Sequence, residues 1–426
     1  MKLCTVGLGY IGLPTSIMFA KHGVDVVGVD IRPEVISSLN SGRIHIEEPG
    51  LQEALNEVVL NGKFKASLKP EEADAFIIAV PTPNNDDLNK SCDLSYVLSA
   101  VSAVLPHVTA GNVLIIESTI APRSMDDYVK PLVEEAGFVV GEDIFLVHCP
   151  ERVLPGQILH ELVYNNRIVG GITNKCTEAG AKVYRTFVKG EVIKTNAKTA
   201  EMSKLMENTF RDVNIALANE MTKVCNELDI NALEVIEMAN KHPRVNLHTP
   251  GPGVGGHCLA VDPYFIVSKA PETAKLISLA REINTSMPKY VIQNVNALLE
   301  KNNGKVITVF GLTYKGNVDD IRESPALEIF ELLKGESKYE VRAFDPHVNH
   351  KMVTKDIREA VNNSDLILIL ADHNEFKFLD YDVLNGMATK QIFDTKNIVV
   401  NHSEEFNYIH FGNLSSNLKT RDVVLA

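Results

Sequence analysis

The chain has 426 residues, of which 45% are hydrophobic and 23% are charged, and its formal net charge at pH 7 is −13. This length exceeds the size at which a single core stops growing, so we expect two or three domains. An acidic chain without clustered Lys and Arg is a poor ligand for nucleic acid or anionic membranes, and no apolar run reaches the 18 residues of a transmembrane helix.

The first element is an apolar strand, Lys2–Val6, which is followed by the glycine-rich sequence GLGYIG at residues 7–12. A helix over Pro14–His22 and a strand over Val24–Val29 come next, and this strand ends in Asp30. Such glycines either form a turn without a ligand or let backbone N–H groups reach a pyrophosphate at a helix N-terminus; this context favours the pyrophosphate. An acid at this place binds ribose hydroxyls and disfavours a 2′-phosphate, so we expect NAD rather than NADP. The predicted cofactor contacts here are Gly7, Gly9, Tyr10, Ile11, Gly12 and Asp30.

Further strands are predicted over Ala75–Val80, Val113–Glu117 and Ile144–Val147, with helical patterns such as Leu94–Leu105 between them. This alternation predicts a doubly wound parallel sheet, in which ligands bind at the carboxyl ends of the strands. The residues that follow these strands are PTP at 81–83, Ser118 and Thr119, and CPER at 149–152. We therefore expect Thr119 and Glu151 near the nicotinamide. The alternative is that Ser118 or Thr119 caps a helix and Glu151 forms a surface ion pair.

A long helix is predicted over Thr199–Leu228, because apolar residues recur at helical spacing without Pro or Gly. Lys204, Asn208 and Arg211 share one face of it, either as a solvated stripe or as part of a cleft. Two more helical patterns follow, Asn231–Lys241 and Pro271–Glu300, the second with a kink or break at Met287-Pro288.

Between these patterns, residues 250–263 read PGPGVGGHCLAVDP. Glycine permits close approach of backbone to a ligand and proline stiffens the chain, so such a loop can present one side chain, here Cys258, with Asp262 nearby. The alternative is an ordinary surface turn with an inert cysteine. The six cysteines include no CxxC pair, which argues against a metal site or a disulfide framework and favours a reducing, cytoplasmic setting. Most of the others are expected in the core.

From residue 304 the strand and helix pattern starts again. Strands are predicted over Lys305–Phe310, Glu340–Phe344 and Asp365–Leu370, with GLTYKG at 311–316 and a helix over Ser324–Leu333. This is a degenerate Rossmann-type unit, either purely structural or able to bind a nucleotide without the same diphosphate turn. The predicted fold is thus α/β: two Rossmann-like doubly wound domains joined by a central helical domain with a long helix. The predicted domains are an NAD-binding domain (1–196), a helical domain with the cysteine loop (197–300), and a Rossmann-like domain (301–426). The long helix of the second domain either crosses between domains or forms a dimer core, and the third domain is a candidate nucleotide-binding unit.

The motifs VGLGYIGLP, AVPTP, ESTIAP, CPERVLPG, EMSKLMENTFRDVNIALANE, PGPGVGGHCLAVDP and FGLTYKGNVDDIRESPA occur in this order. Together they resemble the UDP-glucose/GDP-mannose dehydrogenase family over essentially the whole chain. The stretch KHPRVNLHTPGPGVGGHC is most similar to members that act on UDP-N-acetyl-D-mannosamine. Val261 precedes Asp262 where UDP-glucose enzymes commonly carry Lys, which counts against glucose.

This resemblance implies a four-electron oxidation of a sugar C6 alcohol to a carboxylate, with two NAD reduced, for capsule or surface polysaccharide synthesis. Cys258 would hold the aldehyde as a thiohemiacetal and then as a thioester. UDP-N-acetylglucosamine and UDP-glucose are alternative substrates. A two-electron hydroxy-acid dehydrogenase and a catalytically dead nucleotide-sensing protein are more distant alternatives.

The resemblance also implies roles for individual residues. Lys204 and Asn208 would stabilise an oxyanion, Asp262 would steer protons, and Glu151, with water ordered by Thr119, would assist thioester hydrolysis; either carboxylate remains open as the base. Further cofactor contacts would be Thr82, Pro83, Thr119 and Arg322. Substrate contacts would be Arg152, Val153, Lys204, Asn208, Arg211, His242, Arg244, Gly255, Tyr314 and Lys315.

The resemblance implies a homodimer, formed through the helical domain, in which Arg244 is supplied across the interface. No metal is implied. Cys92 follows the PTPNN loop, and we hypothesise that it pairs with Cys258 under oxidation. The hypothesis is tested by mild oxidation, which should inhibit the wild type but not the Cys92→Ser variant.

Overall fold

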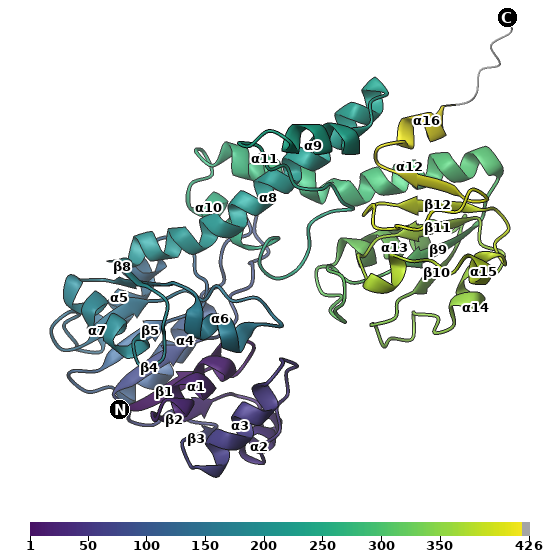
Figure 1. Ribbon diagram of the computed structural model, residues 1–426. Helices are drawn as coiled ribbons and strands as arrows, with labels where there is room; N and C mark the ends of the chain where they lie inside the picture. The colour runs from purple at the N-terminus through teal and green to yellow at the C-terminus, as the bar shows by residue number, and fades with distance from the viewer. Residues whose placement is uncertain (420–426) are drawn as a thin grey trace, which may run out of the picture. The chain divides into compact units, whose positions relative to one another are not determined.

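The computed structural model describes residues 1–419, and these form two compact units. One unit comprises Met1–Glu207 and Tyr264–Pro271, and the other comprises Asn208–Pro263 and the chain from Glu272 onward. Each unit contains one of the two expected sheets (Figure 1).

The N-terminal sheet has eight strands in the order β3-β2-β1-β4-β5-β6-β7-β8. Their bounds are β1 (Lys2–Val6), β2 (Asp25–Val29), β3 (Phe64–Ser67), β4 (Ala75–Ile78), β5 (Val113–Ile116), β6 (Phe145–His148), β7 (Arg167–Gly171) and β8 (Val192–Asn196). All neighbours are parallel except β6 and β7. β4 and β5 are buried along their whole length, as apolar strands covered on both faces should be.

Helices connect these strands, as the alternating pattern predicts (Figure 1). Their bounds are α1 (Gly12–Lys21), α2 (Pro33–Asn40), α3 (Leu51–Leu60), α4 (Ser95–Val104), α5 (Lys130–Glu135), α6 (Ile158–Tyr164) and α7 (Asn174–Tyr184). Helix α1 is buried from Gly12 to Ala20, so it packs deep in the unit and its N-terminus lies at the glycine-rich turn.

The long helix is confirmed as α8 (Ala197–Leu228), which has 32 residues and follows β8 directly. It is followed by α9 (Ala232–Asn240), α10 (Asp262–Lys269), α11 (Lys275–Thr285) and α12 (Met287–Asn302). The pattern predicted over Pro271–Glu300 is therefore two helices that meet at Ser286, and residues 271–274 are not helical. Pro288 stands in the first turn of α12, where a missing N–H costs no hydrogen bond.

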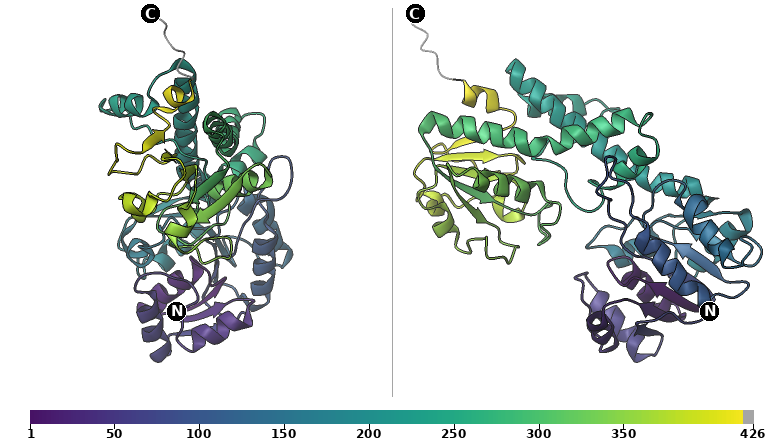
Figure 2. Two further views of the ribbon diagram at one scale, coloured as in Figure 1. Left: turned by 90° about the vertical axis from the view of Figure 1, so that its right-hand side faces the viewer. Right: turned by 180° about the vertical axis from the view of Figure 1, so that it is seen from behind.

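The C-terminal sheet has five parallel strands in the order β10-β9-β11-β12-β13. They are β9 (Val306–Phe310), β10 (Glu340–Phe344), β11 (Leu366–Ile369), β12 (Gln391–Asp394) and β13 (Asn407–His410), with helices α13 (Pro325–Gly335), α14 (Ile357–Val361), α15 (Tyr381–Leu384) and α16 (Leu414–Leu418). Helix α12 packs against α13 and α16 beside this sheet (Figure 2). The second Rossmann-like unit is thus confirmed. Over residues 1–419, no helix is both long and apolar enough to cross a membrane.

Candidate active site

The turn between β1 and α1 has the geometry that a diphosphate needs. Gly7 has φ +95°, and a Cβ added there would lie 2.3 Å from the carbonyl oxygen of Ala79. A Cβ on Gly12 would lie 1.9 Å from the Gly7 carbonyl oxygen, whereas one on Gly9 would meet nothing within 4 Å. The outer two glycines are therefore required by packing, and the middle one leaves open space beside the N-terminus of α1. These residues fit the expected NAD diphosphate.

Asp30 ends β2 and faces the same turn. Its carboxylate accepts hydrogen bonds from the Leu8 N–H (3.2 Å) and from the Arg32 N–H, Nε and NH2 (3.0–3.1 Å). Burial raises the pKa of this carboxyl, but the hydrogen bonds from Arg32 and Leu8 outweigh burial, and the net pKa is lowered. Asp30 is therefore ionised at neutral pH and suits the acceptor role toward ribose hydroxyls.

The Asp30–Arg32 pair gives a prediction about cofactor choice. Asp30→Ala is expected to lower kcat/KM for NAD at least about tenfold, because charge-assisted hydrogen bonds to the ribose are lost. It is also expected to raise kcat/KM for NADP, because Arg32 remains to pair with a 2′-phosphate. Steady-state kinetics with both cofactors measure this change. The double variant Asp30→Ala/Arg32→Ala should lose the gain with NADP, and a gain retained without Arg32 would contradict the explanation.

Ser118, the residue before Thr119, is fixed by hydrogen bonds at the strand ends of the N-terminal unit. The Ser118 hydroxyl accepts a hydrogen bond from the Val80 N–H (2.9 Å) and donates one to the Val80 carbonyl (2.8 Å). Ser118 therefore joins the ends of β4 and β5, and its alternative role as a helix cap is wrong. Thr119 is partly buried beside it, and Thr82 lies in the loop after β4.

Sequence reasoning missed Glu201, which fixes the other end of the Thr119 loop. Its side chain is fully buried on α8 and accepts hydrogen bonds from the backbone N–H groups of Arg123 (2.7 Å) and Met125 (2.8 Å). Burial raises the pKa of Glu201 to about 7. Lys204 lies one turn further along α8 and is only 9% exposed. Lys204 and Asn208 are therefore not part of a solvated stripe, whereas Arg211 on the same face is exposed. Through Glu201, α8 also contacts the segment after Thr119.

Glu151 lies in the segment after β6 and is not a surface residue. Its side chain is 9% exposed, and its Oε2 contacts the guanidinium of the buried Arg167. Its Oε1 accepts a hydrogen bond from the Arg152 N–H (2.7 Å). The alternative of a surface ion pair is therefore wrong for Glu151. Arg152 pairs with Glu207 (2.7 Å), and Val153 beside it is partly buried.

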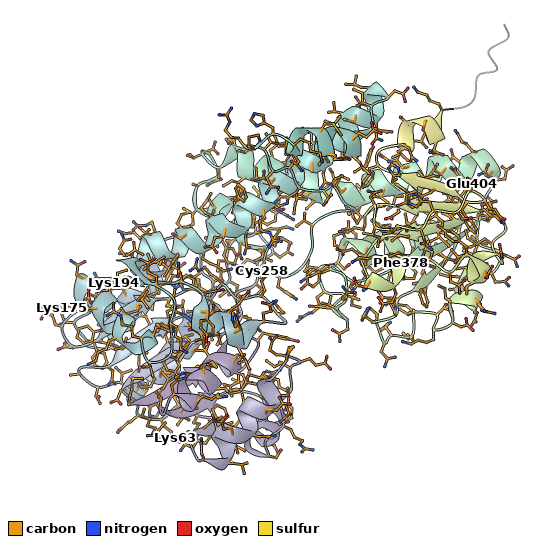
Figure 3. All side chains as sticks on the ribbon, in the orientation of Figure 1. Lys63, Lys175, Lys194, Cys258, Phe378 and Glu404 are labelled. Atoms are coloured by element: carbon orange, nitrogen blue, oxygen red, sulfur yellow. The ribbon has the colours of Figure 1, made fainter. Side chains whose placement is uncertain are left out.

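The C-terminal unit brings Asn208, Cys258 and Asp262 together. Asn208 Nδ2 donates a hydrogen bond to Asp262 Oδ2 (2.6 Å), and both side chains are buried. The Asp262 N–H donates to the Cys258 carbonyl (2.9 Å), so Cys258 begins the turn that leads into α10. Cys258 itself is exposed (Figure 3). An exposed thiol beside a buried amide–carboxylate pair is an arrangement suited to covalent chemistry.

The glycines of the cysteine loop are required by close packing. A Cβ on Gly255 would lie 2.2 Å from the Glu323 carbonyl oxygen, and one on Gly256, at φ +83°, would lie 2.8 Å from the Tyr314 ring. The Gly256 N–H also donates to the Glu323 carbonyl (3.3 Å). The loop therefore lies against the segment after β9, and the predicted substrate residues Gly255 and Tyr314 are neighbours. Lys315 follows Tyr314 and is exposed.

A buried polar network, which the sequence analysis did not single out, anchors the start of this loop. Asn219 Oδ1 accepts a hydrogen bond from the Gly251 N–H (2.9 Å), and its Nδ2 donates to Asn284 (2.9 Å). Asn284 in turn donates to Asp212, which pairs with the buried Arg281 (2.5 Å). These residues lie on α8 and α11, and polar side chains in a helical pattern usually lie on a solvated face. Only the seven-residue spacing of Asp212 and Asn219, which puts both on one side of α8, hinted at a shared partner.

Of the remaining predicted residues, Ile11 is partly buried and the others are exposed. Arg322 pairs with Asp320 (2.7 Å) in the segment before α13. Exposed positions among the predicted ligand contacts also include Tyr10, Pro83, Arg211, His242 and Arg244. His242 and Arg244 lie in the segment after α9, where a ligand or a second subunit can reach them.

The glycine turn of the second unit repeats the first one only in part. Gly311 has φ +85° and its N–H donates to the Phe344 carbonyl (2.9 Å), while the Leu312 N–H donates to Asp345 (2.7 Å). Gly7, Leu8 and Asp30 have the same arrangement. However, Thr313 stands where Gly9 stands, and His373 Nε2 lies 3.2 Å from Asp345 Oδ2. As the sequence predicted, the second unit lacks the dinucleotide turn.

A dinucleotide turn with an ionised acid, a second nucleotide-type sheet and a cysteine beside buried polar groups define an NAD-dependent dehydrogenase. Family models of the UDP-glucose/GDP-mannose dehydrogenases match residues 1–188 (NAD binding domain), 198–286 (central domain) and 308–402 (UDP binding domain). The chain belongs to this family and is an NAD-dependent UDP-sugar dehydrogenase.

Comparisons with solved structures and with curated sequences find similar proteins in the same family. The UDP-N-acetyl-mannosamine dehydrogenase Cap5O from Staphylococcus aureus is 61% identical, with a TM-score of 0.91, and the match covers 98% of this chain and all of that one. The UDP-D-ManNAc dehydrogenase from Pyrococcus horikoshii is 44% identical, with a TM-score of 0.91 and coverage of 97% and 100%. A UDP-N-acetyl-D-mannosamine dehydrogenase from Methanocaldococcus jannaschii is 47% identical over 93% of this chain and 92% of its own length.

Proposed function

We propose that this enzyme oxidises the C6 hydroxymethyl group of UDP-N-acetyl-D-mannosamine to the carboxylate, with reduction of two NAD. The observation that carries the proposal is the exposed Cys258 beside the Asn208–Asp262 pair, in a chain 61% identical to a UDP-N-acetyl-mannosamine dehydrogenase. A four-electron oxidation passes through an aldehyde, and a cysteine can hold that aldehyde between the two steps. An ordinary two-electron dehydrogenase has no use for such a residue.

In the first half of the proposed reaction, Lys204 and Asn208 stabilise negative charge on the C6 oxygen. They are one helical turn apart on α8, and both are shielded from water, where a donor is most effective. NAD, when bound, accepts the hydride in each oxidation. Cys258 then adds through its sulfur to the aldehyde carbon and forms a thiohemiacetal. Loss of a second hydride from that carbon leaves a thioester on Cys258.

In the second half, water adds to the thioester carbon and the carbon–sulfur bond breaks. Glu151 or Asp262 takes the proton of the water, and the Cys258 sulfur leaves as a thiolate that is reprotonated. One alcohol, two NAD and one water thus give one carboxylate, two NADH and three protons. Both carboxylates are held by hydrogen bonds from neighbouring groups, which suits a positioned base.

The sugar is tested by a comparison of substrates. NADH formation is measured with UDP-N-acetylmannosamine, UDP-N-acetylglucosamine, UDP-glucose and GDP-mannose at equal concentrations. We expect the highest kcat/KM with UDP-N-acetylmannosamine. A preference for another of these sugars would overturn the substrate assignment, because epimers differ by only a few contacts of about 1–3 kcal/mol each.

We further propose that the enzyme is a homodimer joined through its central helices. Helix α8 exposes Phe210 (62%), Leu217 (48%), Val224 (47%) and Leu228 (63%), which recur at helical spacing along one side. An exposed apolar stripe of this length is typical of a protein interface. The same dimer would let Arg244 of one protomer reach the substrate of its partner.

The dimer proposal gives a second prediction. Leu217→Glu is expected to shift the enzyme from dimer to monomer in sedimentation velocity, because a charge in an apolar interface is left unpaired. Leu60→Glu is the matched control, since Leu60 is 87% exposed at the end of α3. An unchanged sedimentation coefficient for Leu217→Glu would contradict an interface on this face of α8.

The three family-model matches support the proposed division into domains at 1–196, 197–300 and 301–426. We also propose that the enzyme acts in the cytoplasm and supplies a uronic acid for capsule or surface polysaccharide. Scattered cysteines without a CxxC pair are typical of a reducing compartment. Loss of the uronic acid from surface polysaccharide after deletion of the gene tests this role, and an unchanged sugar composition would oppose it.

A further inference from the structure

A buried set of charged side chains lies at the carboxyl ends of β5 and β6. Glu117 follows β5, Glu151 lies beyond β6, and Arg167 begins β7. Arg167 NH2 lies 3.4 Å from Glu117 Oε1 and also contacts Glu151 Oε2. The side chains of Arg167 and Glu117 are 5% and 0% exposed. One guanidinium therefore joins two carboxylates away from solvent.

The reversal of β7 is what brings Arg167 to Glu151. β6 pairs with β7 in antiparallel register, with Val147 opposite Gly171 and His148 opposite Gly170. Continued by three residues, this register places Glu151 opposite Arg167. If β7 were parallel to β6, its first residue would lie at the amino end of β6, away from Glu151. Among the described strands this is the only antiparallel pair. It places Arg167 at the carboxyl end of β6, where ligands bind in such sheets.

The surroundings of Arg167 explain how it is held. Its guanidinium lies 4.4 Å from the centre of the Tyr184 ring, and the Tyr184 hydroxyl donates a hydrogen bond to Glu117 Oε1 (2.6 Å). Burial raises the pKa of Glu117 to about 7, although Arg167 opposes this rise. Burial also raises the pKa of the adjacent Cys149 thiol to about 12. Burial also raises the pKa of Tyr184 well above its usual range, so its hydroxyl keeps the proton that it donates to Glu117.

Stability alone is a poor reason for this arrangement. Burial of ions costs free energy that their attraction barely repays, and apolar replacements of such clusters are often neutral or stabilising. Glu117 Oε2 and Arg167 Nε have no hydrogen-bond partner, so the cluster is not optimised as a structural brace. The member of this cluster that takes part in the proposed reaction is Glu151. Its other oxygen, Oε1, accepts a hydrogen bond from the Arg152 N–H (2.7 Å).

We propose that Arg167 is a positioning residue for thioester hydrolysis, which holds the Glu151 carboxylate in the orientation that accepts the proton of the attacking water. The proposal rests on the role of Glu151 in the proposed function. In this step the water oxygen bonds to the thioester carbon, its proton passes to Glu151, and the Cys258 sulfur leaves with the electrons of the broken bond. Arg167 acts through Glu151, and its guanidinium also contacts Glu117 and the Tyr184 ring.

The test separates oxidation from hydrolysis. Enzyme is mixed rapidly with UDP-N-acetylmannosamine and NAD, the NADH burst is recorded, and intact mass spectrometry measures the acyl adduct on Cys258. Arg167→Lys is expected to keep the burst rate within about threefold while kcat falls about 10- to 100-fold and the adduct accumulates, because a misplaced base slows only hydrolysis. In Arg167→Ala, millimolar guanidinium is expected to restore part of kcat and to reduce the adduct.

Two comparisons guard against a folding artefact. The double variant Arg167→Met/Glu117→Gln leaves no buried charge at these two positions and is expected to retain the wild-type melting temperature more closely than Arg167→Met, yet still to accumulate the adduct. Arg185→Met, at an exposed arginine after α7, is expected to match the wild type.

The outcomes distinguish the two levels of the proposal. Glu151→Gln should accumulate the adduct as well; if it does not, the hydrolytic role of Glu151 fails and the inference falls with it. If Glu151→Gln accumulates the adduct but the Arg167 variants hydrolyse it at the wild-type rate, only the inference is overturned. An equal loss of burst and steady-state rates in Arg167→Lys, without rescue of Arg167→Ala by guanidinium, would likewise overturn it.

Discussion

Cys258→Ser is expected to bind UDP-N-acetylmannosamine with a similar Kd but to form no uronate, with kcat reduced by at least about 10⁴-fold. A serine hydroxyl of the same size is a far weaker nucleophile than a thiolate at neutral pH, so the aldehyde is not captured and the second oxidation cannot proceed. Calorimetry measures the binding, and mass spectrometry of the sugar products measures the oxidation.

The matched control is Cys225→Ser, which changes a buried cysteine of α8 and is expected to leave kcat unchanged. Trace aldehyde released by Cys258→Ser would agree with the covalent account, since the first oxidation does not need the sulfur. Uronate formed by Cys258→Ser at a rate near that of the wild type would contradict it.

Lys204→Met is expected to lower kcat about 10²- to 10³-fold with little change in KM, because an oxyanion donor is worth this much when it acts mainly in the transition state. Lys204 is 9% exposed, so methionine replaces its stem with little loss of packing. Steady-state kinetics with varied UDP-sugar and NAD separate kcat from KM.

Lys198→Met tests whether any lysine of α8 would give the same effect. Lys198 is exposed in the first turn of α8, and its replacement should leave kcat and KM unchanged. A rise in KM alone for Lys204→Met would assign Lys204 to substrate binding and remove it from the chemistry.

Much of the architecture could be predicted because its signals are local. A short apolar run bounded by polar residues, such as Ala75–Ile78, is typical of a buried strand, and the absence of Pro and Gly indicates the long helix α8. The strands that escaped prediction have weaker signals. β7 contains an arginine and two glycines, and β8 is a largely exposed edge strand without an apolar run. The antiparallel pairing of β6 and β7 depends on how the whole sheet assembles, and no local sequence pattern predicts it.

The residues of the candidate site also fall into those with a local sequence signal and those without one. Cys258 and Asp262 could be proposed because a glycine- and proline-rich loop marks them, and Lys204 and Asn208 because helical spacing groups them and the family resemblance assigns them a role. Glu201 and Arg167 could not, because each acts on a partner far away in the chain: Glu201 on the Arg123 segment and Arg167 on Glu151. A single carboxylate or arginine in a helix or strand pattern resembles any solvated charge until the fold supplies its partner.

The most direct test of the central claim is the number of NADH formed per UDP-N-acetylmannosamine consumed, measured by absorbance at limiting substrate with excess NAD. If Cys258 holds the aldehyde between two oxidations, the ratio is two and the product is the uronate. A ratio of one, with an aldehyde or ketone as the product, would contradict the account and place the enzyme among two-electron dehydrogenases.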